Sequence, residues 1–121
     1  MKLIKKSIAL IFTISTLTFN AQTSKDLNTA FSQSYDYEAI AKYDAAITAI
    51  NNVYSATSYE INLRMGWLNY MAGKSKESIG YYQKAIALMP AATEPKWAII
   101  NPYTVLENWT EIEKTYLAIL K

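Results

Sequence analysis

Two stretches of this chain carry the same arrangement of side chains. The segment "EAIAKYDAAITAI" begins at Glu38, and "ESIGYYQKAIALM" begins at Glu77. Glutamate, isoleucine, tyrosine, alanine and isoleucine recur in the same places, so five of thirteen positions are identical. In both segments the large residues follow one another at spacings of three and four, which makes one face of an amphipathic helix. The pattern predicts two related helices, each with one buried face.

A third copy, "NWTEIEKTYLAILK", starts at Asn108 and aligns Trp109 with Ser75 of the second copy. We expect Asn108 to cap this helix together with Glu111 three residues later, which is a capping-box arrangement. The first offset, from Glu38 to Glu77, is longer than the second. The extra residues are expected in a longer connection, "NNVYSATS" at residues 51–58, because its Asn and Ser content is typical of a loop.

A further helix is expected before each of these segments, and the clearest runs from Tyr59 to Met71. Its large apolar residues lie on two faces, so it has to be covered on more than one side. Gly73 is expected to end it, and Ser75 to cap the helix that follows. In the third copy, Pro102 should kink or split the corresponding segment, Lys96 to Leu106. The predicted unit is a helix, a short turn and a second helix.

These units resemble the tetratricopeptide repeat, a family whose helix-turn-helix unit has about 34 residues. The family order is a small residue in mid-helix, an aromatic residue, a glycine at the turn, then small, aromatic and small residues and a final proline. The matching positions in the second unit are Gly66, Tyr70, Gly73, Ser78, Tyr82, Ala85 and Pro90. The first unit keeps Ala39, Tyr43 and Ala46. The third is weaker, because Ile112 and Ile119 replace small residues.

The resemblance implies an all-α fold in which antiparallel helix hairpins stack as a short right-handed solenoid. About three units and roughly six helices would follow an N-terminal signal helix. The expected units are 22–52, 57–90 and 93–121. Gly66, Ser78 and Ala85 would let helix backbones approach closely, as dense packing requires. Tyr82 would fill the wedge between neighbouring units.

In this family the first helices of successive units line a concave groove that holds a peptide or a helix of another protein. The positions that the resemblance assigns to the groove are Glu60, Leu63, Trp67, Tyr70, Met71, Trp97 and Asn101. Leu63, Tyr70 and Met71 have an alternative interpretation as core between units, since aromatic stripes at helical spacing usually pack. Trp67 is the strongest candidate, because Gly66 opens space behind it and Trp is enriched among binding hot spots.

The family's basic clamp for a C-terminal carboxylate needs Lys, Arg and Asn at these groove positions. This sequence has Leu63, Trp67 and Tyr70 there, and Arg64 is the one nearby cation. The resemblance therefore favours an apolar or aromatic contact with a protein or peptide partner.

The N-terminus has the order of a secretory signal peptide. Met1–Lys6 is basic, Ser7–Phe19 is an uncharged and mostly apolar run, and Ala21 is placed for cleavage, although Phe19 is bulky where a small side chain is preferred. The run is shorter than the roughly 20 residues of a membrane-spanning helix. We predict a signal peptide at residues 1–21 and export to the periplasm or the outside, with an uncleaved anchor as the alternative and the only contact with a membrane.

Charge and composition exclude several classes of function. Removal of the leader takes three of the twelve basic residues and none of the ten acidic ones, so no footprint for nucleic acid remains. The chain has no His and no Cys, which removes the usual metal sites and the Ser-His and Cys-His nucleophiles. Its three glycines stand alone and form no phosphate-binding loop. No cofactor and no metal are expected.

The densest acidic cluster is Glu107, Glu111 and Glu113, beside Lys114. A carboxylate pair is the remaining route to catalysis, as in glycosidases. Acids at a helix start are more simply a solvated face that favours the helix dipole. The triplet "NWT" at Asn108 matches a glycosylation motif, but the helix cap is the preferred interpretation.

The C-terminal edge lacks the polar outer face with which repeat arrays normally end. Leu117, Ile119 and Leu120 come directly before Lys121. Two interpretations follow: the chain is the N-terminal portion of a longer repeat protein, or this edge self-associates or pairs with another chain.

The sequence thus favours a non-catalytic scaffold for protein-protein interaction. One alternative is a folding base for a longer protein whose function lies downstream. Another is an accessory domain that acts on glycan through Glu107 and Glu111.

Overall fold

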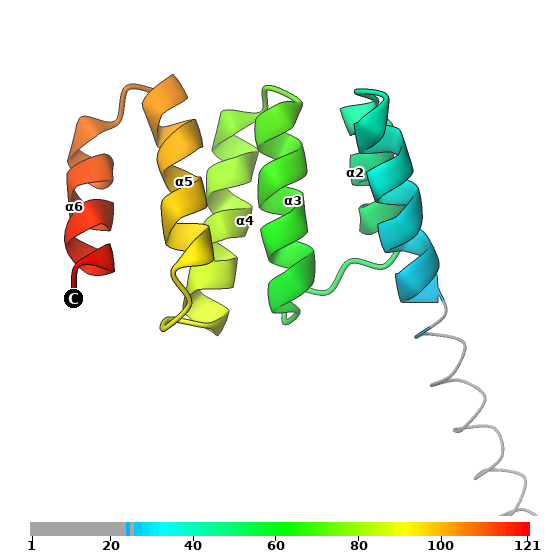
Figure 1. The fold of residues 1–121 in the computed structure, drawn as a ribbon, viewed down its shortest axis with the longest axis horizontal. Coiled ribbons are helices and arrows are strands. Elements are labelled where there is room, and N and C mark those ends of the chain that lie inside the picture. Colours follow the sequence, from blue (N-terminus) through cyan, green and yellow to red (C-terminus); the bar gives the residue numbers. More distant parts are fainter. Residues whose placement is uncertain (1–23, 25) are drawn as a thin grey trace, which may run out of the picture.

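The computed structural model describes residue 24 and residues 26–121, and all regular structure in this part of the chain is helical (Figure 1). A first helix runs through residues 26–39. The helices that follow are α2 (Tyr43–Asn51), α3 (Tyr59–Met71), α4 (Ser75–Leu88), α5 (Glu94–Val105) and α6 (Trp109–Ile119). The predicted all-α fold with about six helices is confirmed. The predicted signal peptide, residues 1–21, lies outside the described residues.

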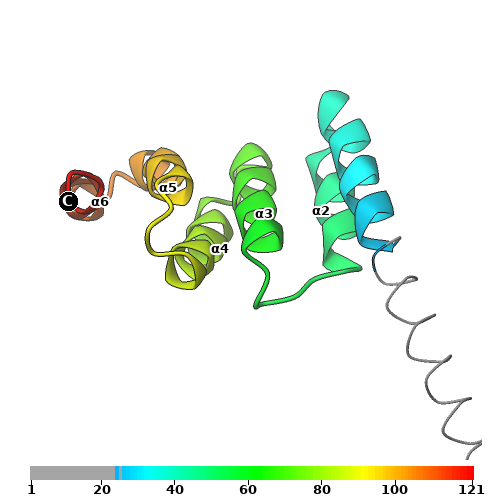
Figure 2. The same cartoon turned by 60° about the horizontal axis from the view of Figure 1, so that its bottom comes forward.

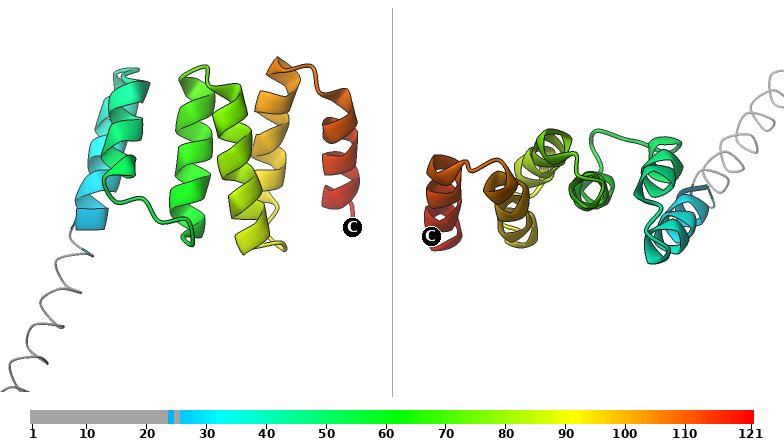
Figure 3. Two further views of the ribbon diagram at one scale, coloured as in Figure 1. Left: turned by 180° about the vertical axis from the view of Figure 1, so that it is seen from behind. Right: turned by 90° about the horizontal axis from the view of Figure 1, so that it is seen from above.

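Successive helices stand side by side in one row from the first helix to α6 (Figures 1 and 3). Each labelled helix packs on the next, and α3 also contacts α5. In the view of Figure 2, α3 and α5 lie on one side of the row and α4 on the other. The central helix α3 is therefore covered by α2, α4 and α5, as its two apolar faces predicted.

The same turn closes three pairs of helices. It places one residue in the left-handed region of φ at Ala41 (56°), Gly73 (76°) and Glu107 (55°). In each turn the next residue donates its backbone N–H to a carbonyl in the last turn of the preceding helix. These pairs are Lys42 with Tyr37, Lys74 with Asn69 and Asn108 with Tyr103. This is the closure of a helix C-terminus by a left-handed residue. The three turns are therefore equivalent points in three successive units.

The predicted alignment of Glu38 with Glu77 is therefore wrong, because the turns align Ala41 with Gly73 instead. The expected helix from Glu38 to Ile50 is broken, since residues 38 and 39 end the first helix and α2 begins only at Tyr43. Ile40 lies in the turn and is exposed, and Ala39 is also exposed. The connection at residues 52–58 is long because α2 is short.

The new register reassigns the small residues of the first unit. Ala46 corresponds to Ser78 rather than to Ala85, and both side chains are fully buried. Tyr43 corresponds to Ser75, at the start of the second helix of each pair.

The helix ends differ in part from the predictions. Asn108 caps α6 as predicted, by accepting from the backbone N–H of Glu111 at 3.4 Å. The reciprocal half of the predicted capping box does not form, because the N–H of Asn108 donates to the Tyr103 carbonyl. Ser75 is not a cap, because it is the first residue of α4 and follows the N-cap residue Lys74. The cap that the sequence analysis missed is Ser58, whose hydroxyl accepts from the N–H of Ile61.

The first helix of the third pair runs through its proline without a break. Pro102 is buried inside α5, which is continuous over Glu94–Val105, so the predicted split of this segment is wrong. A proline in a helix interior removes one backbone hydrogen bond, and burial of the ring offsets part of that cost.

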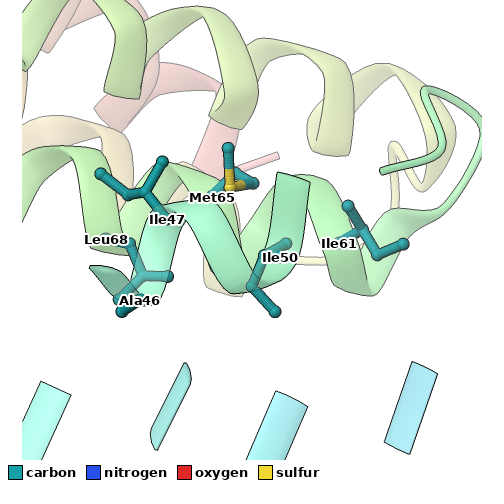
Figure 4. Close-up of a cluster of buried hydrophobic side chains, with 6 residues drawn as sticks. All are labelled: Ala46, Ile47, Ile50, Ile61, Met65 and Leu68. Carbon is teal, nitrogen blue, oxygen red and sulfur yellow. The ribbon is translucent and has the colours of Figure 1, made fainter. Parts of the chain in front are cut away.

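Two apolar clusters hold the row together. The first joins α2 to α3 through Ala46, Ile47, Ile50, Ile61, Met65 and Leu68 (Figure 4). The second joins α4 to α5 through Tyr82, Ile99 and Tyr103, and Leu63 of α3 packs against it. Burial of this apolar area is what stabilises a chain without disulfides.

The two helices of the middle pair approach each other closely at Gly66. A Cβ atom there would lie 2.5 Å from the ring of Tyr82, which is fully buried. The Ser78 hydroxyl donates to the Gly66 carbonyl at 2.7 Å. Ala85, one turn beyond Tyr82, is also fully buried, whereas Pro90 is exposed in the turn after α4.

Candidate binding groove

An open groove of about 320 Å³ lies where the first helix, α3 and the start of α5 come together. We call it the aromatic groove. It is lined by Phe31, Tyr35, Glu60, Leu63, Arg64, Trp67 and Glu94. The helices of its walls belong to three different pairs, so the groove exists only because the pairs pack side by side.

The structure brings together some of the predicted site residues and separates others. Glu60, Leu63 and Trp67 line the aromatic groove, and Tyr70 lies against Trp67 with 6.0 Å between ring centroids. Met71 lines a separate pocket with residues 41–45 and Ala72.

The two predicted residues of α5 lie away from the aromatic groove. Trp97 packs edge-on against Tyr116 of α6, with 5.9 Å between ring centroids, and is otherwise exposed. Asn101 is exposed one turn later. Only Glu94, at the start of α5, reaches the groove.

One wall of the groove is organised around Arg64, whose side chain is only 8% exposed. Its Nη1 forms an ion pair with Glu38 Oε2 at 2.5 Å, and its Nε donates to the Ser34 hydroxyl at 3.1 Å. The guanidinium carbon lies 3.9 Å from the centroid of the Tyr35 ring. Arg64 on α3 thus ties itself to three residues of the first helix.

The same carboxylate also holds Trp67. The indole Nε1 donates to Glu38 Oε1, so both oxygens of Glu38 accept from α3. Hydrogen bonds to a charged acceptor are stronger than neutral ones. Glu38 therefore fixes the orientation of Trp67, whose side chain remains 36% exposed at the groove.

One polar atom of this network has no partner. Arg64 Nη2 is buried and makes no hydrogen bond among the described residues. A buried donor without an acceptor is costly, and such groups are rare in folded proteins. Arg64, one of the residues that line the groove, therefore lacks one hydrogen-bond acceptor.

The opposite end of the groove is acidic. Glu60 and Glu94 are exposed, and neither has an ion-pair partner among the described residues. Burial and the negative charges of Glu94 and Glu60 raise the pKa of Tyr59, so both carboxylates act on one neighbour. With Glu38 and Arg64 included, the groove has three carboxylates and one guanidinium, and its net charge is −2.

Sequence reasoning missed the contributions of the first helix to the groove. The alignment of the turns supplies them, because it places Phe31 on Leu63 and Tyr35 on Trp67. Arg64 was noted only as a nearby cation, and its pairing with Glu38 depends on how two helices pack, which no local pattern encodes.

The acidic cluster of the third pair has a different arrangement. Glu107 occupies the left-handed position of the turn, and Glu111 pairs with Lys114 at 2.8 Å and raises the pKa of that lysine by this hydrogen bond and by its charge. Across the described residues, no group of three or more His, Cys, Asp or Glu side chains could hold a metal ion.

The outer helix α6 has no buried residue. Large apolar side chains exposed on it and beside it are Val105, Leu106, Trp109, Tyr116, Leu117 and Leu120. The predicted self-association through this edge stays a prediction.

Comparison of the chain with models of protein families gives no match, and comparison with curated protein sequences gives none either. Within residues 26–121, no helix is both long enough and apolar enough to cross a membrane.

Proposed function

We propose that this protein is a non-catalytic scaffold that binds a peptide or a helix of another protein in the aromatic groove. The observation that carries the proposal is Trp67, a partly exposed indole whose orientation is fixed by Glu38 beside an open groove. A rigid aromatic side chain loses little conformational entropy on binding, and Trp is common among hot spots.

We further propose that the helix pairs form a right-handed solenoid of the tetratricopeptide type. Support comes from the three equivalent turns at Ala41, Gly73 and Glu107, whose spacing is close to the family's unit of roughly 34 residues. The contact of Gly66 with Tyr82 adds support, because it is a close approach at the position where the family has a small residue. Export by the N-terminal leader belongs to the same proposal.

A selection of random dodecapeptides displayed on phage tests the binding function. The purified chain should enrich a set of peptides that bind the Trp67→Ala variant at least tenfold more weakly than the wild type. Trp109→Ala is the matched control, because Trp109 is exposed on α6, away from the groove, and its removal should leave binding unchanged. If no enriched peptide depends on Trp67, or if Trp109→Ala alone abolishes binding, the groove assignment is wrong.

A further inference from the structure

We infer that the aromatic groove selects a peptide segment in which a lysine or arginine stands next to a large apolar residue. The inference rests on the proposed function and adds the chemistry of the partner. In the bound state the basic side chain meets Glu60 and Glu94, the apolar side chain packs on Trp67, and a neutral main-chain carbonyl accepts from Arg64 Nη2.

The preference for a basic side chain follows from the two carboxylates that have no ion pair. Glu60 and Glu94 come from different helices and line the same groove, and no cation of the described residues forms an ion pair with either. A lysine or arginine placed between them gains two attractions and relieves their mutual repulsion. An acidic segment would meet the net negative charge of the groove and be repelled.

The apolar preference follows from the walls. Phe31, Leu63 and Trp67 supply apolar surface within reach of the acidic end. An aromatic face also attracts a cation that lies over it, so Trp67 can contact the stem or the head of the basic side chain. This combination favours adjacent basic and apolar residues over either kind alone.

The buried guanidinium indicates a second contact. Arg64 lines the groove and is already neutralised by Glu38, so its free Nη2 needs an acceptor but not a second negative charge. A peptide carbonyl meets this need. Nη2 lies beneath the surface, and the Tyr35 ring that covers the guanidinium is itself exposed. In the proposed complex the carbonyl reaches Nη2 when this ring turns aside, and the carbonyl contact replaces the ring's contact with Arg64.

The sequences of the selected dodecapeptides test this inference separately from the function. Peptides that need Trp67 should be enriched in Lys or Arg adjacent to Leu, Phe, Tyr or Trp. If peptides need Trp67 but carry no basic enrichment, or are enriched in Asp and Glu, the inference fails and the proposed function stands. If no peptide needs Trp67, both fail.

Fluorescence anisotropy of one enriched peptide, synthesised with a C-terminal amide, tests the contacts. The double variant Glu60→Gln/Glu94→Gln should weaken binding about three- to tenfold at low salt, as exposed ion pairs do. The matched control Glu113→Gln, an exposed carboxylate on α6, should leave binding unchanged. Replacing the peptide's basic residue with Gln should weaken binding to the wild type more than binding to the double variant, which keeps the contact with Trp67.

Arg64→Lys keeps the charge and removes the planar guanidinium. It should weaken binding of the amidated peptide about tenfold. The same peptide with a free C-terminal carboxylate should bind no better than the amide. Tighter binding of the carboxylate form, or tighter binding to the Glu60→Gln/Glu94→Gln variant, would overturn the inference.

Discussion

The pair α3–α4 and the pair α5–α6 close with the same turn and differ in what covers their second helix. Tyr82 on α4 and Tyr116 on α6 occupy equivalent positions in their units, yet Tyr82 is 1% exposed and Tyr116 is 44% exposed. The reason is that α5 packs on α4, whereas no described helix packs on the outer side of α6.

The turn and the burial of the second helix depend on different parts of the sequence. The turn depends on a few local residues and forms in both pairs. Burial depends on the neighbouring pair, so the same aromatic position is core in one pair and surface in the other. Stability in such a row is the sum of pair and interface contributions.

The largest expected difference lies at these two tyrosines. Tyr82→Ala should lower the free energy of unfolding by about 3–5 kcal/mol, because it leaves a cavity between α3, α4 and α5. Tyr116→Ala should cost only about 0.5–1.5 kcal/mol, the loss of its edge-on contact with Trp97. Urea unfolding followed by circular dichroism measures both, and equal effects would contradict the comparison.

Two glycines of the middle pair differ in what surrounds them. Gly66→Ala should destabilise by about 1–3 kcal/mol, because the new methyl group meets the ring of buried Tyr82. Gly80→Ala should stabilise by about 0.5–1 kcal/mol, because a Cβ there has no contact within 4 Å and alanine favours the helix. A stabilising Gly66→Ala would show that α3 and α4 are less tightly packed than described.

Substitutions at the three equivalent turns include the smallest expected effects. Gly73→Ala should destabilise by about 1 kcal/mol, because it puts a side chain at φ +76°. Ala41→Gly and Glu107→Gly should each stabilise by a few tenths of a kcal/mol, because glycine adopts this conformation without strain. Thermal unfolding measures these changes. A lower unfolding temperature for Gly73→Ala and a higher one for Ala41→Gly would support the equivalence of the turns, and shifts in the same direction would argue against it.

The middle pair is where sequence reasoning succeeded. Gly73 marks the turn, and the apolar residues of Tyr59–Met71 define a helix whose bounds the structure reproduces. The turn of the first pair was not predicted, because Ala41 takes the left-handed conformation without the usual glycine. The apolar residues from Glu38 to Ile50 keep a helical spacing across this turn. That spacing is why the sequence aligns Glu38 with Glu77.

Only part of the aromatic groove was predictable from the sequence. Glu60, Leu63 and Trp67 share one face of α3, which helical spacing shows directly. The pairing of Glu38 with Arg64 and Trp67 joins two helices across the wall of the groove and depends on their packing. No local pattern contains that information.

The three tryptophans of this chain give the most direct test of the account. Trp67 lies in the aromatic groove, Trp97 against α6, and Trp109 at the start of α6. Their indole Nε1–H signals can be followed by NMR in the ¹⁵N-labelled protein while a selected peptide is added. The Trp67 signal should shift in proportion to binding, and the Trp109 signal should stay in place. A shift of Trp109 with no change at Trp67 would contradict the claim that this groove is the binding site.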